Sequence, residues 1–377
     1  MNRNIITYTH NITYGLKIND YVGTVKYLLE ELNKPDNEIV IIILDSEARF
    51  TSYSQHNTEF YDEIDSFIRT FTALGITGEN VSYVLQSKLN GLYELAYFFS
   101  NGFSNSAIKQ YETHNTSINL KTGISYDSKI SNSFSLMLEL ASIVSVGTTQ
   151  LLTPPEKREQ IALCLKQLNR ICADDGLNHR EWRRLERERA ETIKLLKDGE
   201  TLPEPTNPIE IFTIPASIRT TVLRGIDGSV LLNKSNCIYL SDSLETIERK
   251  IKSMYTDPRH LRPSDAIIDS NTGKIDLNFE GNPLMEYLSA FCNSEHCNKF
   301  FHKCKDIEEI KLRYATGGDT GLGDYELKVL LTKIIQELVI ELNTKTKNNR
   351  KIIISEKYIN SPLKILERLF LIYPALR

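Results

Sequence analysis

Two short segments of this sequence carry residue types that could hold a phosphate group. The first, LKINDYVG (16–23), has the layout of a turn between a strand and a helix, with Lys17 as its cation. The second is the glycine-punctuated segment LRGIDGSVLLNKSN (223–236), in which neither packing nor helix propensity requires Lys234 and Ser235. Because an ammonium group on a flexible stem is a competent phosphate ligand, these segments predict a nucleotide site.

The segments after the first turn predict an α/β fold. A short β-branched apolar run, EIVIIILD (38–45), is typical of a strand buried on both faces of a parallel sheet. Apolar residues follow at helical spacing in DEIDSFIRTFTALGI (62–76), which ends at Gly75, and NVSYVLQS (80–87) predicts the next strand. Strands that alternate with helices predict right-handed crossovers and a doubly wound sheet, with the ligand at the carboxyl ends of the strands.

The second half of the chain has a different pattern. A helix is predicted at REQIALCLKQLNRICADDG, and residues 179–197 hold seven basic and four acidic side chains. This charged segment is either a solvated helix or an arm that binds a partner such as RNA, with Trp182 as an anchor. The proline-rich TLPEPTNPIE (201–210) predicts a linker or surface loop, IEIFTIPASI (209–218) is strand-like, and from Ser241 onward the pattern is almost wholly helical.

Composition excludes several classes of protein. The 377 residues, 41% hydrophobic and 25% charged, suffice for one large or two medium domains. A formal net charge of -4 and a pI near 6.1 argue against a protein that mainly coats nucleic acid, although a local basic face could still meet an RNA. We find neither an apolar leader nor an apolar run long enough for a membrane span, so we expect a cytoplasmic protein.

Three of the six cysteines cluster, and they could form a zinc site. Cys292, Cys297 and Cys304 lie near His296 and His302. Against zinc, the cluster lacks a C-x-x-C pair and follows the apolar helical stretch YLSAFC. We therefore expect reduced cysteines in helices and no structural metal.

The order of segments resembles the tryptophanyl-tRNA synthetase family, which are class I aminoacyl-tRNA synthetases. Residues 71–101 resemble the family's segment of long helix, strand and helix. SIVSVGTTQ (142–150) resembles its P-V-G-E-D-Q element, and IDGSVLLNKS (226–235) lies where the family has L-D-x-x-K-M-S-K-S. Its helical domain is resembled by LSDSLETIERKIKSMYTDP, GNPLMEYLSAFC and YATGGDTGLGDYELKVLLTKII. The resemblance covers nearly the whole chain and implies a Rossmann domain with a parallel doubly wound sheet, followed by an all-helical C-terminal domain.

The resemblance also implies domain boundaries and partners. Residues 1–175 and 205–240 would form the Rossmann domain, 176–204 a charged helical insertion with a proline-rich linker, and 241–377 a helical, tRNA-binding-like domain. The ligands expected from the family are ATP accompanied by Mg2+, an amino acid or an adenylate, and tRNA. A homodimer is also expected, and neither DNA nor a membrane is.

The first signature motif departs from the family. Where the family has H-L-G-N or H-I-G-H, this chain has Lys17, Ile18, Asn19 and Asp20. The imidazole is lost, and Asn19 replaces the glycine that lets adenine lie against the backbone, so its side chain would occupy that space. Lys17 could partly replace the lost phosphate ligand, whereas Asp20 would repel phosphate.

The second signature motif departs as well. It keeps Lys234 and Ser235, but Leu231, Leu232 and Asn233 precede them, so the first of the family's two lysines is lost. A protein accelerates this kind of transfer mainly by aiming fixed donors at charge that develops on the phosphates. Loss of such donors predicts a loss of activity.

The amino-acid pocket implied by the resemblance has also changed. Ser135 stands where the family has an aspartate that reads the indole N–H of tryptophan, so the preference for tryptophan is in doubt. Thr148 and Thr149 replace an acidic pair, while Gly147 and Gln150 remain.

The resemblance thus implies three groups of site residues. The candidates are Lys17, Lys234 and Ser235 for catalysis, Gly15, Asn19, Asp20, Gly23, Gly147, Gln150, Gly225, Asp227 and Asn233 for the nucleotide, and Ser135 for the substrate. The glycines and Asp227 could equally persist because their turns need them.

Three functions remain open on the sequence. The favoured one is a tryptophanyl-tRNA-synthetase-like protein that has lost or redirected tRNA charging and still binds ATP, an amino acid or an adenylate. The alternatives are a divergent but active ATP-dependent ligase, and a regulatory or scaffold dimer that binds tRNA or protein.

Overall fold

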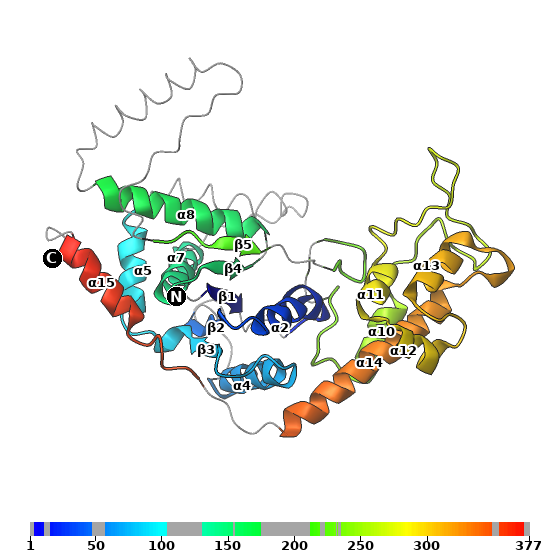
Figure 1. The fold of residues 1–377 in the computed structure, drawn as a ribbon, viewed down its shortest axis with the longest axis horizontal. Coiled ribbons are helices and arrows are strands. Elements are labelled where there is room, and N and C mark those ends of the chain that lie inside the picture. The colour runs from blue at the N-terminus through cyan, green and yellow to red at the C-terminus, as the bar shows by residue number, and fades with distance from the viewer. Residues whose placement is uncertain are drawn as a thin grey trace, which may run out of the picture.

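The molecule combines a sheet covered by helices with a second, mainly helical half (Figure 1). The structure is a computed structural model. It describes residues 4–10, 16–46, 57–103, 130–153, 155–174, 212–218, 223–230, 232, 235–348 and 354–372. The charged segment 179–197, with Trp182, and the proline-rich segment 201–210 lie outside the described residues.

The sheet is parallel throughout its five described strands. They are β1 (Asn4–His10), β2 (Asn37–Ile43), β3 (Val81–Leu85), β4 (Gln150–Leu152) and β5 (Ala216–Ile218), in the order β3-β2-β1-β4-β5. The strand order reverses between β1 and β4, which makes their carboxyl ends the topological switch point where ligands of such sheets bind. The predicted doubly wound sheet is confirmed, and LKINDYVG follows the strand at its switch point.

Local sequence explains why the central strands form. All seven residues of β2, NEIVIII, are buried, because helices cover both faces of the sheet and β-branched side chains fit a pleated surface. The strands predicted at 38–45 and 80–87 are therefore confirmed as β2 and β3. In the segment 209–218, only Ala216–Ile218 is strand among the described residues. Pro215, which has no N–H to donate to a ladder, precedes it.

Two layers of helices enclose the sheet. The described elements are α1 (Ile18–Asp20), a π-helical turn (Tyr21–Val25), α2 (Lys26–Leu32), α4 (Asn57–Ala73), a 3-10 turn (Gln86–Lys88), α5 (Leu92–Ser100), α7 (Ile130–Ser145) and α8 (Pro155–Asp174). One face packs against α2 and α4, with Phe71 of α4 completely buried. The other face packs against α5, α7 and α8. The helix predicted at 62–76 is confirmed, and it ends before Gly75, whose φ of 97° few other residues adopt.

The second half contains α10 (Leu244–Lys252), α11 (Pro283–Phe291), α12 (Ser294–His296), a π-helical turn (Cys297–Phe301), α13 (Ile307–Thr316), a 3-10 turn (Gly318–Thr320), α14 (Asp324–Asn348) and α15 (Ser361–Ile372). Side-chain caps start four of these helices, at Ser243, Asn282, Asn293 and Asp306. Figure 1 shows α14 running from the helical half towards α4, with which it is in contact. The last helix, α15, instead packs against α5 and α7.

One stretch of this half contradicts the expectation of an almost wholly helical pattern. Residues 253–282 form turns and loops with one antiparallel bridge between Ile268 and Ile275. Two prolines, Pro258 and Pro263, interrupt the first part of this stretch. In the second part Asp269 accepts hydrogen bonds from two backbone N–H groups that follow it, which stabilises a turn instead of a helix.

The clustered cysteines are part of the core of the helical half. Cys292, Cys297 and Cys304 are buried, and the Sγ atoms of Cys292 and Cys297 lie 3.5 Å apart. Burial raises the pKa of all three thiols. No group of three or more His, Cys, Asp or Glu side chains in the described part of the chain is arranged to hold a metal ion. None of the described helices has the length and apolar character needed to cross a membrane.

Candidate functional site

The two signature segments meet at the switch point. Residues 16–18 pair with residues 238–240 in antiparallel fashion, and the N–H of Ile18 donates to the carbonyl of Ile238 at 2.9 Å. Lys17 lies in the middle of this pairing. The chain that follows the second motif is therefore hydrogen-bonded to the start of the first, as a shared site requires.

Asn19 connects the first motif to the start of the second. It is 3% exposed, and its Nδ2 donates to the carbonyl of Leu223 at 2.6 Å, the carbonyl of Arg224 at 3.3 Å and the hydroxyl of Tyr287 at 3.1 Å. The Tyr287 hydroxyl in turn donates to the Arg224 carbonyl at 3.1 Å. Burial raises the pKa of Tyr287, so its hydroxyl keeps the proton that it donates. The carboxamide thus lies against the backbone at residues 223 and 224.

A carboxylate on α11 holds the same backbone from the helical half. The N–H and the Nε of Arg224 donate to the two carboxylate oxygens of Glu286 at 3.3 and 3.2 Å. The N–H of Gly281 also donates to Glu286, at 3.1 Å. Because the Arg224 side chain is partly buried, this ion pair is screened less than one at the surface. The start of the second segment is therefore anchored to α11.

Asp227 and Gly225 determine the shape of the second segment. Oδ1 of Asp227 accepts hydrogen bonds from the N–H of Ser229 at 2.9 Å and from Nδ2 of Asn236 at 3.2 Å. A Cβ at Gly225 would lie only 2.7 Å from the side chain of Asn236. Gly228 has a φ of 81°, which glycine adopts without strain. These contacts give Gly225 and Asp227 a part in the turn itself.

The remaining predicted site residues either take no part in these contacts or lie outside the described residues. Gly23 is buried within the π-helical turn, and Ser235 is exposed. The residues outside the described part are Gly15, Asn233 and Lys234, together with the side chain of Asp20. The structure therefore does not place the retained lysine of the second motif.

Gly147 and Gln150 lie at the opposite edge of the sheet from the two motifs. Gly147, with a φ of 72°, ends α7 just before β4, and Gln150 is the first residue of β4. Parallel strands share their amino ends at one edge, here marked by Ile6 of β1, which pairs with Gln150. The structure does not bring these two residues to the carboxyl edge. Ser135 lies within α7 and is partly buried.

Sequence reasoning missed a polar layer between α7 and the carboxyl edge. Oγ1 of Thr9 in β1 donates to Oε1 of Glu139 at 2.8 Å, and Nε2 of Gln86 donates to Oγ of Ser142 at 3.2 Å. All but Thr9 are completely or almost completely buried. The sequence did contain one indication of this layer, an acidic residue inside the apolar helical run LMLELASIV. Burying a charge in such a helix costs free energy unless other groups compensate it.

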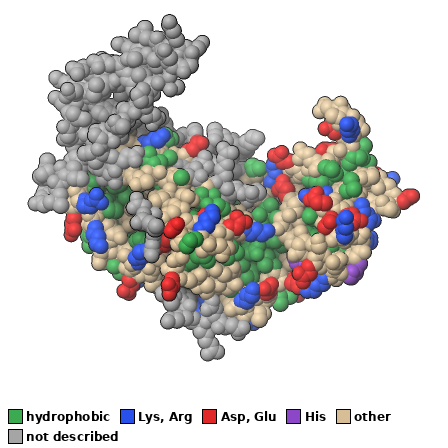
Figure 2. All heavy atoms as spheres, viewed as in Figure 1, with side chains coloured by type: hydrophobic (Ala, Val, Ile, Leu, Met, Phe, Trp, Pro, Cys, Tyr) green, Lys and Arg blue, Asp and Glu red, His purple; other side chains and the backbone are tan. Residues whose placement is uncertain are grey.

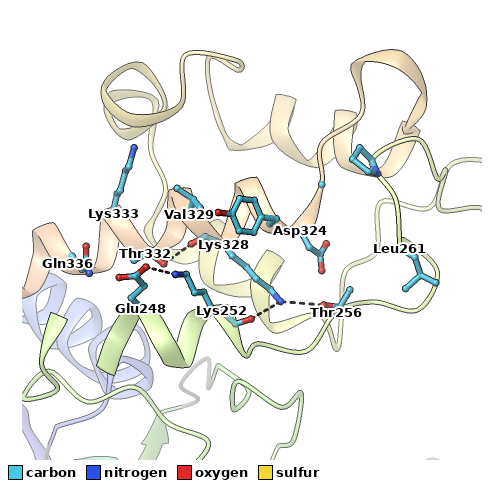
Figure 3. Close-up of a pocket in the computed structure, with 13 residues that line it drawn as sticks. Glu248, Lys252, Thr256, Leu261, Asp324, Lys328, Val329, Thr332, Lys333 and Gln336 are labelled. Carbon is cyan, nitrogen blue, oxygen red and sulfur yellow. Dashed lines mark hydrogen bonds and ion pairs between the residues drawn. The ribbon is translucent and has the colours of Figure 1, made fainter. Parts of the chain in front are cut away.

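A hollow in the helical half has a volume of about 670 Å³ (Figure 3). It lies between α10 and α14, and Tyr325 and Leu261 at its wall are 76% and 72% exposed. Lys328 at its floor is 8% exposed, and its Nζ donates to the Met254 carbonyl at 2.7 Å. Burial lowers the pKa of this ammonium group. Its charge is thus directed at protein carbonyls.

Neither positive nor negative charge dominates the face of the molecule seen in Figure 2. Figure 2 shows Lys and Arg side chains interspersed with Asp and Glu among the residues coloured by type on the viewed face. Several basic groups are paired, such as Lys252 with Glu248 and Lys345 with Glu341. Alternating charge of this kind fits the modest net charge of the sequence.

The fold is that of the class I aminoacyl-tRNA synthetases. A tryptophanyl-tRNA synthetase from Campylobacter jejuni, solved as a complex with ADP and tryptophan, superposes with a TM-score of 0.61 at 18% identity, and 99% of each chain is covered. A tyrosyl-tRNA synthetase from Archaeoglobus fulgidus, solved with L-tyrosine, also gives a TM-score of 0.61 at 15% identity, over 92% of this chain and 91% of that one. The predicted fold class is confirmed.

Sequence comparison narrows the resemblance to the tryptophanyl enzymes. The tryptophan–tRNA ligase of Clostridium longisporum is 26% identical over 353 residues, which are 93% of this chain and 88% of that protein. The chain matches no protein-family model. The resemblance to tryptophanyl-tRNA synthetases predicted from the motifs is confirmed over most of the chain.

Proposed function

We propose that this chain is a tryptophanyl-tRNA-synthetase-like protein whose ordinary tRNA charging has been lost or redirected. A site formed by residues 15–23 and 225–235 would still accept a nucleotide, an amino acid or an adenylate. The observation that carries the proposal is Asn19, which stands where the resembled family has glycine and bonds to the backbone carbonyls of Leu223 and Arg224. A side chain in that position competes with any ligand that would lie against the same backbone.

Chemistry supports a loss of ordinary charging. In the family reaction an amino-acid carboxylate attacks the α-phosphate of ATP and pyrophosphate leaves, so the protein contributes by positioning and by stabilising phosphate charge. The first motif of this chain offers Lys17 in place of an imidazole, and the second lacks one of two lysines. Lys17, Lys234 and Ser235 are the groups proposed to contact phosphate, with Mg2+ accompanying the nucleotide.

The relatives support the proposed ligands and partner. The Campylobacter jejuni structure contains ADP and tryptophan, and the curated relatives are named as tRNA ligases. We propose tRNA, an amino acid and ATP as ligands of this chain on that basis. The domain boundaries and the cytoplasmic location remain predictions.

A divergent active ligase is the second candidate function. It is favoured by the pairing of residues 16–18 with residues 238–240, which keeps Lys17 next to the chain that follows the second signature segment. Pyrophosphate exchange with each of the twenty amino acids distinguishes the outcomes: fast exchange with tryptophan supports an active ligase, fast exchange only with another amino acid supports redirection, and no exchange supports a loss of activation.

Removing Lys234 is expected to weaken nucleotide affinity by about tenfold or more, because a hydrogen bond to a charged group contributes about 1.5 to 3 kcal/mol. Lys17→Ala should weaken it further if Lys17 has taken over the lost role. Calorimetry with ATP and with a non-hydrolysable aminoacyl-adenylate analogue measures both effects. Lys345→Ala, in the exposed ion pair with Glu341, is the matched control. If neither compound produces heat or a thermal shift with wild type, only the scaffold function remains.

We expect a homodimer through the aromatic face of α5. Tyr93 and Tyr97 are 41% and 66% exposed there, whereas Phe71 of the FTALGI segment is completely buried and is not available for an interface. Tyr97→Asp should shift the protein towards monomer in light scattering, and Tyr325→Asp on the helical half should not. A wild-type monomer at micromolar concentration would count against the dimer.

A further inference from the structure

Two cysteine side chains lie in contact at the end of α11. Cys292 directly follows α11, and Cys297 begins the π-helical turn that comes after α12. Their Sγ atoms are 3.5 Å apart, and the two residues are 7% and 0% exposed. A disulfide bond holds its sulfur atoms about 2.0 Å apart. A small rotation of the two side chains therefore brings them within bonding distance.

A local turn explains why these two residues meet. Residues five apart on an uninterrupted helix do not face one another. Here the backbone of Cys292 is extended, with φ -80° and ψ 130°, so α11 ends. The side chain of Asn293 then accepts the N–H of His296 at 2.8 Å, and its carbonyl accepts the N–H of Cys297 at 3.1 Å. This turn places the second thiol beside the first.

The third cysteine of the cluster has a different partner. The sulfur of Cys304 accepts a hydrogen bond from Nη1 of Arg313 at 3.6 Å. The guanidinium group is held in place by the carbonyls of Lys303 and Thr320, at 2.6 and 2.8 Å. Because Cys304 is directed at α13, we take Cys292 and Cys297 as the pair. A bond between two sulfur atoms also needs no third ligand, which a metal ion usually requires.

Burial determines how this pair reacts. It raises the pKa of both thiols, and because the thiolate is the reactive form, the reduced pair is the resting state. A large reagent such as oxidised glutathione does not reach sulfur atoms that are buried to this extent, whereas hydrogen peroxide is little larger than water. Cys292 is the more exposed of the two and is expected to react first.

We propose that Cys292 and Cys297 form a site of reversible oxidation, at which hydrogen peroxide converts the two thiols to a disulfide. The thiolate of Cys292 attacks one peroxide oxygen and the O–O bond breaks, which leaves a sulfenic acid and a hydroxide that takes up the thiol proton as water. The sulfur of Cys297 then attacks the sulfenic sulfur, and the hydroxyl group leaves with the Cys297 proton as a second water. Two thiols are oxidised and one peroxide is reduced, and a thiol reductant reverses the reaction.

The disulfide would fix a helix that contacts the first signature motif. The ring of Phe291 stacks on Tyr21, with ring centroids 5.7 Å apart, and the carbonyl of Ala290 accepts the Nζ of Lys26 at 2.7 Å. A bond from Cys292 to the π-helical turn would hold this end of α11 in place. Oxidation of the pair does not require that the chain bind a nucleotide, so its test is independent of the proposed function.

Mass spectrometry of the full-length protein tests the site. The protein is treated with hydrogen peroxide, then unfolded, labelled with N-ethylmaleimide and digested with trypsin. Residues 275–299 form one tryptic peptide that contains both cysteines, because Lys274 and Lys299 are the cleavage sites that bound it. We expect peroxide to replace the doubly labelled peptide with an unlabelled one that is two hydrogen atoms lighter than the reduced peptide. Cleavage after Glu295 should give two fragments that separate only when dithiothreitol is added.

Serine variants identify the sulfur atoms. Cys292→Ser and Cys297→Ser should each abolish the unlabelled peptide, whereas the matched control Cys304→Ser should keep it. If a variant does not fold, the masses of the wild-type peptides provide the test alone. Three results would overturn the proposal: a peptide that keeps both labels at every peroxide concentration, a disulfide that joins Cys304 to residues 275–299, and sulfinic or sulfonic acids without a disulfide.

Discussion

Tryptophan-dependent pyrophosphate exchange by the purified chain is expected to be about four to six orders of magnitude slower than in an intact tryptophanyl-tRNA synthetase. Two phosphate-handling groups of the family motifs, an imidazole and a lysine, are replaced here. Removing one preorganised donor typically costs about 3 to 4 kcal/mol of transition-state stabilisation. The carboxamide of Asn19 at the backbone of residues 223 and 224 adds an obstacle to ATP itself.

The Clostridium longisporum relative, assayed under the same conditions, is the control for this measurement. An exchange rate within about tenfold of that enzyme would refute the loss of ordinary activation. Slow exchange with tryptophan but fast exchange with another amino acid would show redirection.

Replacing Asn19 with glycine is expected to raise the affinity for adenine nucleotides by about tenfold or more, which corresponds to about 1.4 kcal/mol or more of binding free energy. Without the carboxamide, the carbonyls of Leu223 and Arg224 become available to the amino group of adenine. The same change should lower the free energy of unfolding by about 2 to 4 kcal/mol, because buried acceptors lose their donor and glycine adds backbone entropy to the unfolded chain. Calorimetry with ATP and denaturant unfolding measure the two effects separately.

Tyr287→Phe is the matched control for Asn19→Gly. It removes the hydroxyl that donates to the Arg224 carbonyl but leaves the carboxamide of Asn19 in place. We expect a loss of stability of about 1 to 2 kcal/mol and no gain in nucleotide affinity. Equal nucleotide affinity in wild type and Asn19→Gly would show that Asn19 does not obstruct the nucleotide.

Strands β2 and β3 were predictable because their signals are local, whereas β1 and β4 were not predicted. Residues 39–43 of β2, IVIII, are buried on both faces of the sheet and are all apolar and β-branched, and such a run is visible in the sequence. The turns and loops of residues 253–282 were not predicted, because prolines and the turn stabilised by Asp269 change the backbone at single positions. Changes at single positions leave no repeating pattern of apolar residues in the sequence. A repeating pattern of apolar residues marks the buried face of a helix or strand, and residues 253–282 contain few regularly spaced buried residues.

The candidate site was predictable in part. Motif order placed residues 16–23 and 223–236 together, and in the structure Asn19 bonds to the backbone carbonyls of residues 223 and 224. Glu139 could not be assigned from its position in the chain, because its partner Thr9 is 130 residues away. A contact between residues so far apart in the chain leaves no pattern in the local sequence of either one.

The sequence by itself determined strands β2 and β3 with the helix between them, the resemblance to tryptophanyl-tRNA synthetases and the loss of two signature residues, since each of these follows from residue type and spacing. Only the tertiary structure decided where the side chain of Asn19 lies, that Gly147 and Gln150 stand at the amino edge, and that Glu139 is buried at the carboxyl edge. The physical reason is that hydrogen bonding and burial depend on distances through space. Those distances are set by how the parallel strands align and by the helices that pack across them.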